Sequence, residues 1–147
     1  MATYFLQYLM RYFWRFLKFI PPLAIASFIL VGCQPSRFTQ CQQIIQVTNS
    51  AKSVPVAQNP NEFTVIAQNL EGINLKVQAI ALTDKTLNSY KIGFSQLYTA
   101  VAQSSRQIAQ SVQERNQNNL NQSQQQLQVL ADQEVALVAE VNKYCTE

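Results

Sequence analysis

Residues 63–112 read FTVIAQNLEGINLKVQAIALTDKTLNSYKIGFSQLYTAVAQSSRQIAQSV, and apolar side chains recur through them at alternating spacings of three and four. This spacing places them on one side of an α-helix. One set consists of Phe63, Leu70, Val77, Asp84, Lys91, Tyr98, Ser105 and Val112, and the other of Ile66, Ile73, Ile80, Leu87, Phe94, Val101 and Ile108. The second set is apolar throughout, whereas Asp84 and Lys91 interrupt the first. Periodicity alone would allow one helix across the whole stretch.

Two arguments divide this stretch near Thr83-Asp84. A single helix would be about 80 Å long, since each residue adds about 1.5 Å, and its shorter neighbours could not cover it. Thr83 and Asp84 are also good N-cap residues. We therefore expect one helix to end before Thr83 and the next to run from about Lys85 to about Glu114.

The segment before this stretch predicts a second helix start and a separate first helix. In Asn59-Pro60-Asn61-Glu62, Asn59 is suited to be the N-cap, Pro60 the first helical residue and Glu62 the acidic partner of a capping box. A helix from about Phe38 to about Ser53 is expected to end before Val54-Pro55, because the residue before proline disfavours helical geometry. Its apolar face consists of Phe38, Cys41, Ile44, Ile45 and Thr48.

The C-terminal segment predicts one more helix, from about Gln122 to about Tyr144, after a turn at Asn116–Asn121 in a Gln- and Asn-rich tract. Its apolar side contains Leu127, Leu130, Leu137, Val138, Val141 and Tyr144. Glu134 interrupts that side. It could pair with Lys91 or Lys85 across a bundle, or lie at the edge and face water.

The residues Leu30-Val31-Gly32-Cys33 close a short apolar segment ahead of the first expected helix. They resemble the lipobox of bacterial prolipoproteins, in which Leu, a small aliphatic residue and Gly precede an obligatory Cys. The resemblance implies that a diacylglyceryl group alkylates Cys33, that a membrane peptidase cuts between Gly32 and Cys33, and that Cys33 becomes the lipidated first residue. Such alkylation needs a thiol, because only a thiolate is nucleophilic enough at neutral pH.

The flanks of this motif fit a signal peptide. Residues 19–32 carry no charge, and they are short for a membrane-spanning helix, which needs about 20 residues. Three basic residues precede them: Arg11, Arg15 and Lys18. We expect residues 1–32 to be the signal peptide, with Met10 as an alternative start, residues 33–37 a lipidated tether and residues 38–147 the helical domain. An uncleaved membrane anchor is the alternative.

The cysteines predict a disulfide and thereby the number of helices. The chain has three; if Cys33 carries lipid, Cys41 and Cys145 remain as an even pair in a compartment that permits disulfides. Two free buried thiols are the alternative. In a bundle of four antiparallel helices, the start of the first helix and the end of the last lie at the same end, whereas with three helices they lie at opposite ends. A disulfide needs Cα atoms about 6 Å apart, so it can form only in the four-helix arrangement. We therefore expect an all-α, antiparallel up-down four-helix bundle.

The charge distribution argues against nucleic-acid binding. The formal net charge is +3, but Arg11, Arg15 and Lys18 account for it, and the eight basic residues after Cys33 balance eight acidic ones. Nucleic-acid binding requires a clustered positive face, and the sequence has none.

The residue inventory also argues against an enzyme. The chain has no histidine, which excludes His-based acid–base catalysis and nearly all zinc and copper sites. Asp132 and Glu134 are two residues apart and do not share a helix face. The sequence contains no glycine-rich phosphate loop. We therefore expect no catalytic residues, no metal and no cofactor.

The leading interpretation is a non-enzymatic lipoprotein that is anchored to the membrane by lipid on Cys33 and contacts a protein partner. It would face the periplasm from the cell membrane or the outer membrane. The alternative is a small-molecule-binding or sensor bundle that uses an aromatic stripe formed by Tyr90, Phe94 and Tyr98, although core packing explains such a stripe as well. The expected architecture is also similar to lipidated four-helix subunits on the lumenal face of cyanobacterial photosystem II, a resemblance in lipobox and helix count that would imply a thylakoid-lumen location.

Overall fold

The computed structural model describes residues 35–147, which are all-helical and contain no strand. Four α-helices are present, as the sequence predicts, together with one short 3-10 helix. They are α2 (Arg37–Asn49), η2 (Ser50–Ser53), α3 (Glu62–Gln78), α4 (Lys85–Gln113) and α5 (Gln117–Thr146).

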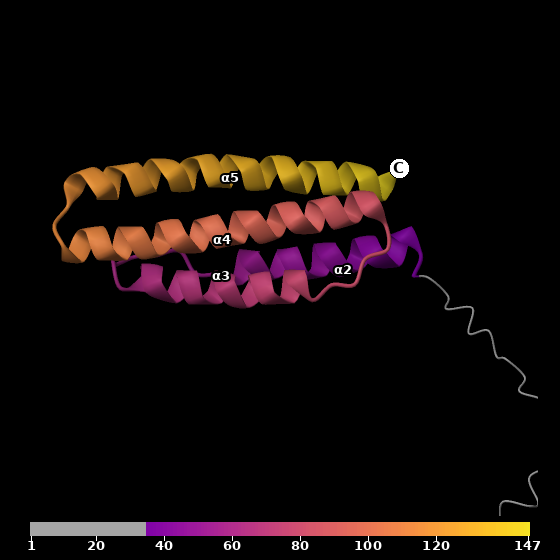
Figure 1. Ribbon diagram of the computed structural model, residues 1–147, viewed down its shortest axis with the longest axis horizontal. Helices are drawn as coiled ribbons and strands as arrows, with labels where there is room; N and C mark the ends of the chain where they lie inside the picture. The colour runs from indigo at the N-terminus through magenta and orange to yellow at the C-terminus, as the bar shows by residue number, and fades with distance from the viewer. Residues whose placement is uncertain (1–34) are drawn as a thin grey trace, which may run out of the picture. The chain divides into compact units, whose positions relative to one another are not determined.

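Successive α-helices run in alternating directions and lie side by side (Figure 1). The most extensive packing is between α3 and α4 and between α4 and α5, and α2 contacts the other three α-helices. The start of α2 and the end of α5 therefore lie at the same end of the bundle, as predicted. A salt bridge also joins α4 to α3: the Arg106 guanidinium donates hydrogen bonds to both carboxylate oxygens of Glu71, each at 2.7 Å.

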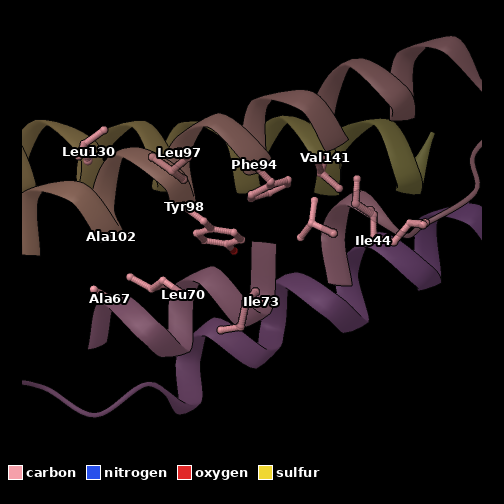
Figure 2. Close-up of a cluster of buried hydrophobic side chains, with 12 residues drawn as sticks. Ile44, Ala67, Leu70, Ile73, Phe94, Leu97, Tyr98, Ala102, Leu130 and Val141 are labelled. Carbon is pink, nitrogen blue, oxygen red and sulfur yellow. The ribbon is translucent and has the colours of Figure 1, made fainter. Parts of the chain in front are cut away.

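The core is one cluster to which all four α-helices contribute (Figure 2). Its buried members are Ile44, Ala67, Leu70, Ile73, Val77, Ile80, Phe94, Leu97, Tyr98, Ala102, Leu130 and Val141. Most of these residues occupy the predicted apolar positions, so the three-four spacing identified the buried faces. Phe38 is an exception: it was expected on the buried face of the first helix, but 66% of its surface is exposed.

The predicted break between the second and third helices is confirmed. Helix α3 ends at Gln78, and Asp84 caps α4 by accepting a hydrogen bond from the Leu87 backbone N–H at 2.9 Å. Lys91, which interrupts the apolar pattern, donates its ammonium to the carbonyl of Ile80 at 3.2 Å. Asp84 therefore belongs to the connection between the two helices, and Lys91 bonds to that connection from within α4.

The start of α3 differs from the prediction by two residues. Helix α3 begins at Glu62, and Asn59-Pro60-Asn61 form a turn before it. The Glu62 carboxylate accepts hydrogen bonds from the Gln58 backbone N–H and the Asn59 side-chain amide, both at 2.5 Å. Glu62 thus accepts hydrogen bonds from residues ahead of it, as the acidic residue of a capping box does. Here, however, it stabilises the residues that precede α3 and not the first turn of α3 itself.

The start of α5 was predicted five residues too late. Arg115 takes a left-handed backbone conformation (φ 53°), which ends α4, and the Asn116 side chain caps α5 by accepting from the Asn119 N–H at 3.1 Å. The connection is therefore tight, and most of the Gln- and Asn-rich tract is helical. Exposed Gln is a good helix former, so polarity alone did not indicate a loop here.

Candidate functional site

The residues to which the sequence assigns lipidation and cleavage, Cys33 and Gly32, lie outside the described residues, and so does the expected signal peptide. The description begins at Pro35, just before α2. The candidate site is therefore the end of the bundle at which the expected tether joins α2. We call it the tether end; it comprises residues 35–41 of the α2 start, residues 79–85 of the α3–α4 connection and residues 143–147 of the α5 end.

The predicted disulfide between Cys41 and Cys145 is present at the tether end. The two Cα atoms are 5.8 Å apart, and the bond joins residues separated by 104 positions. Cys41 is buried and Cys145 partly buried. The bond ties the first turns of α2 to the last turn of α5. Of the three cysteines in the sequence, Cys33 is the one outside this pair.

Gln40 connects the tether to the α3–α4 connection. Only 3% of its surface is exposed. Its side-chain N–H donates to the carbonyl of Pro35 at 2.8 Å, and its side-chain oxygen accepts from the backbone N–H groups of Thr83 at 2.7 Å and Asp84 at 3.0 Å. One amide therefore satisfies three backbone groups and fixes the path of the chain back to Pro35.

Asp84 links the same connection to α5. The Tyr144 hydroxyl donates to its second carboxylate oxygen at 2.8 Å. The hydrogen bond from the Leu87 backbone N–H, and then that from Tyr144, lower the pKa of Asp84 below its ordinary value despite partial desolvation. The Arg37 guanidinium lies 5.1 Å above the Tyr144 ring, which joins the start of α2 to this group.

The aromatic stripe of Tyr90, Phe94 and Tyr98 is mostly interior. Phe94 and Tyr98 are 1% and 2% exposed, stack with ring centroids 5.9 Å apart, and lie inside the core cluster (Figure 2). Tyr90 is partly buried against Tyr144, with centroids 6.1 Å apart. The stripe therefore does not form an exposed face, and Phe94 and Tyr98 act as packing residues.

Glu134 pairs with neither Lys91 nor Lys85 among the described residues. It lies half-buried near the Tyr98 hydroxyl. Desolvation raises the pKa of Glu134, and burial together with the nearby carboxylate raises the pKa of Tyr98. No hydrogen bond to the Tyr98 hydroxyl has acceptable geometry within residues 35–147. The Glu134 carboxylate therefore opposes ionisation of Tyr98, whereas the neutral Tyr98 hydroxyl lowers the pKa of Glu134 and offsets part of its desolvation.

An open groove of about 440 Å³ lies between α4 and α5. Its apolar lining includes Leu97, Leu130 and Leu137, and Gly93 allows α5 to approach α4, since a Cβ there would be 3.3 Å from Leu137. Neither Phe94 nor Tyr98 lines the groove. The predicted aromatic stripe and this groove are therefore separate features.

Within residues 35–147, no group of three or more Cys, Asp or Glu side chains is arranged to hold a metal ion. In the same range, no helix combines the length and the apolar character that crossing a membrane requires.

Three features of the tether end were not foreseen from the sequence: the Gln40 amide, the bond between Asp84 and Tyr144, and the exposure of Phe38. Gln40 is one of many glutamines, and its pattern gives no sign of burial. Comparison of the chain with protein families, with curated proteins and with solved structures finds no match in any of the three.

Proposed function

We propose that this chain is a bacterial lipoprotein: Cys33 carries the lipid, and the helical bundle of residues 38–147 is held at a membrane surface outside the cytoplasm. The observation that carries the proposal is the lipobox-like Leu30-Val31-Gly32-Cys33 immediately before a disulfide-closed domain. The leader before Cys33 is the signal peptide, and cleavage leaves Cys33 at the N-terminus.

The arrangement of cysteines supports this proposal. Cys41 and Cys145 bond to each other, which leaves Cys33 as the thiol available for alkylation. A disulfide is also typical of a protein that folds in an oxidising compartment such as the periplasm. Alkylation of Cys33 before folding would prevent it from competing for either partner.

Two acyl chains on Cys33 would anchor the domain stably. Each buried CH₂ contributes about 0.8 kcal/mol, and one chain alone gives only marginal binding. The diacylglyceryl group supplies two chains, and N-acylation of the new N-terminus would supply a third. The lipid thus provides the membrane attachment without any contribution from the helices.

At the membrane, the bundle acts as a non-enzymatic binding or structural subunit for a protein partner. The chain lacks histidine, and within the described residues Phe94 and Tyr98 fill the core instead of lining the groove between α4 and α5. An architecture of helices closed by one long-range disulfide supplies a rigid surface, which suits a docking role.

The anchor is tested by detergent-phase partitioning of membranes from cells that express the full chain. We expect the wild-type protein in the detergent phase and a Cys33→Ala variant in the aqueous phase or still as precursor. The control variant Gln34→Ala keeps the thiol and should partition like the wild type. A Cys33→Ala protein that is processed and still partitions with detergent would contradict the proposal.

The partner is tested by purifying the tagged protein from detergent-solubilised membranes. A non-enzymatic subunit should bring down one stoichiometric complex, and the same protein should be recovered after chemical cross-linking in intact cells. Recovery of the lipidated chain alone under both conditions would argue against a fixed protein partner and leave the anchor untouched.

A further inference from the structure

The tether leaves the bundle at a fixed place. The Gln40 side chain holds the Pro35 carbonyl at 2.8 Å, and the same amide is held by the Thr83 and Asp84 backbone N–H groups. Ser36 caps α2 by accepting from the Thr39 N–H at 3.2 Å. The described chain therefore begins at Pro35, ahead of α2, and its path there is set by a buried hydrogen-bonding group.

Very little chain remains between this point and the lipidated residue. Only Gln34 separates Pro35 from Cys33, so their Cα atoms are at most about 7 Å apart. The headgroup region of a bilayer adds roughly 5–7 Å to each side of its hydrocarbon core. A diacylglyceryl group on Cys33 would have its glycerol at the level of the lipid glycerols, so the tether end would lie against the headgroups.

The tether end presents an aromatic side chain beside the tether. Phe38 is 66% exposed, and each of the other aromatic residues in the described part of the chain is buried or partly buried. Five extended residues reach at most about 17 Å, and the helical turn at the start of α2 makes the distance from Cys33 to Phe38 shorter. Phe38 is therefore within reach of the region where aromatic side chains gather in membranes.

The charges at this end do not oppose contact with lipid. Arg37, Lys85 and Lys143 are exposed here. Of the carboxylates, Asp84 accepts hydrogen bonds from Leu87 and Tyr144, and Glu147 lies 4.0 Å from Lys143. The surface around Phe38 is therefore polar and slightly basic, which is the composition expected of a segment that lies in a headgroup layer.

We propose that the tether end is a lipid-facing surface, with Phe38 inserted among the headgroups and Arg37 beside it, so that the bundle stands on the membrane by this end. This inference rests on the lipidation of Cys33 proposed above. The opposite end, with the η2–α3 connector and the α4–α5 turn (Figure 1), then points away from the membrane and is available to other molecules.

The test uses tryptophan fluorescence of the full chain, matured in cells and purified with its lipid. The one tryptophan of the sequence is Trp14, ahead of Cys33, so the mature wild-type protein has none. Phe38→Trp reports on the tether end. Val56→Trp is the matched control, because Val56 is 85% exposed and lies in the η2–α3 connector, about the length of α3, or about 25 Å, away.

Both variants are reconstituted in vesicles of phosphatidylcholine and phosphatidylglycerol, with or without bromine on the acyl chains near the glycerol. We expect the brominated lipid to quench Phe38→Trp strongly and to leave Val56→Trp unquenched, and the emission of Phe38→Trp to shift to the blue on reconstitution. Intact mass and flotation of each sample establish that the lipid is present.

Each outcome decides at least one of the two proposals. A lipidated, floating protein whose Phe38→Trp is not quenched would overturn the lipid-facing surface, and it would favour a protein or a second copy as the occupant, while the anchor would stand. Equal quenching of both variants would mean that the bundle lies on its side, which also overturns the inference. A protein without the diacylglyceryl mass would overturn both proposals.

Discussion

At the scale of single residues, the tether end depends on polar side chains that supply hydrogen-bond partners for backbone groups between the helices. The α3–α4 connection has backbone N–H groups without helical partners at Thr83 and Asp84, and the Gln40 side chain accepts from both. Because Gln40 also donates to Pro35, its substitution would affect three backbone groups at once.

We therefore predict that Gln40→Ala lowers the free energy of unfolding by about 1–3 kcal/mol, since it leaves partly buried backbone groups unsatisfied. Urea unfolding followed by circular dichroism measures the loss. The control is Gln43→Ala, an exposed position on the same helix, where the change should stay within about 0.5 kcal/mol. Equal effects of the two substitutions would contradict the role assigned to Gln40.

Glu134 provides a prediction on pH. Desolvation raises its pKa in the folded state, so folding favours the protonated form. The stability that this carboxyl contributes is present below its unfolded pKa of about 4.3 and is lost as the pH rises through the folded value. At neutral pH, ionised Glu134 therefore costs more in the folded protein than in the unfolded chain.

We expect Glu134→Gln to be more stable than the wild type at pH 7 and equal to it near pH 4, because the amide keeps the shape without the charge. Urea midpoints across this range test the expectation. Glu140→Gln, at an exposed position of the same helix, serves as the control and should not show this pH-dependent gain. A Glu134→Gln variant that is less stable at pH 7 would show that the charge is favourable.

At the scale of helices, the sequence predicted the features that follow a repeating pattern of residues and missed those that depend on contacts between distant residues. The apolar spacing identified most buried positions but not the break between α3 and α4, and Asp84 marked the start of α4 because an N-cap is a local signal. The start of α5 was missed, since Arg115 in a left-handed conformation is uncommon for a residue other than Gly, Asn or Asp. The aromatic stripe was assigned either to a core or to a binding face, and only the neighbouring helices decide between these.

Some parts of the site could not be predicted because they join residues that lie far apart in the sequence. The hydrogen bonds from Thr83 and Asp84 to Gln40 span 43 and 44 residues, and the bond from Tyr144 to Asp84 spans 60. No spacing rule within a helix reports such pairs. The disulfide is the exception, because only two cysteines remained once Cys33 was assigned to lipid. An even number of antiparallel helices also places the start of the first helix and the end of the last at the same end of the bundle.

The two helical glycines give a prediction about α3 and α4. A Cβ at Gly72 would meet nothing within 4 Å, whereas a Cβ at Gly93 would be 3.3 Å from a Leu137 methyl carbon. Gly72→Ala should therefore stabilise the protein by about 0.5–1 kcal/mol through helix propensity. Gly93→Ala should gain less or lose stability, because Leu137 has to move. A larger gain at Gly93, measured by urea unfolding, would show that α4 and α5 are not closely packed there.

At the scale of the whole molecule, one covalent bond closes almost the entire domain. The bond between Cys41 and Cys145 joins positions 104 residues apart and fixes the start of α2 to the end of α5. The same end carries Pro35 and the tether. The bundle would therefore be reinforced where it meets the anchor, and the helices would extend from this end as one rigid unit.

We predict that Cys41→Ala/Cys145→Ala lowers the free energy of unfolding by about 4–5 kcal/mol, because the unfolded chain regains the freedom that a closed loop of about 100 residues removes. Thermal and urea unfolding measure the difference, and the reduced wild type should unfold like the double variant. A loss below about 1 kcal/mol would mean that the bond adds little constraint beyond helix packing.

The central claim is that Cys33 is the lipidated first residue of a domain folded outside the cytoplasm. The most direct test is the intact mass of the protein extracted from membranes. We predict a polypeptide that begins at Cys33, carries at least a diacylglyceryl group and lacks the two hydrogens lost in the bond between Cys41 and Cys145. A native polypeptide that begins at Met1 or Met10 and carries no fatty chain would contradict the account.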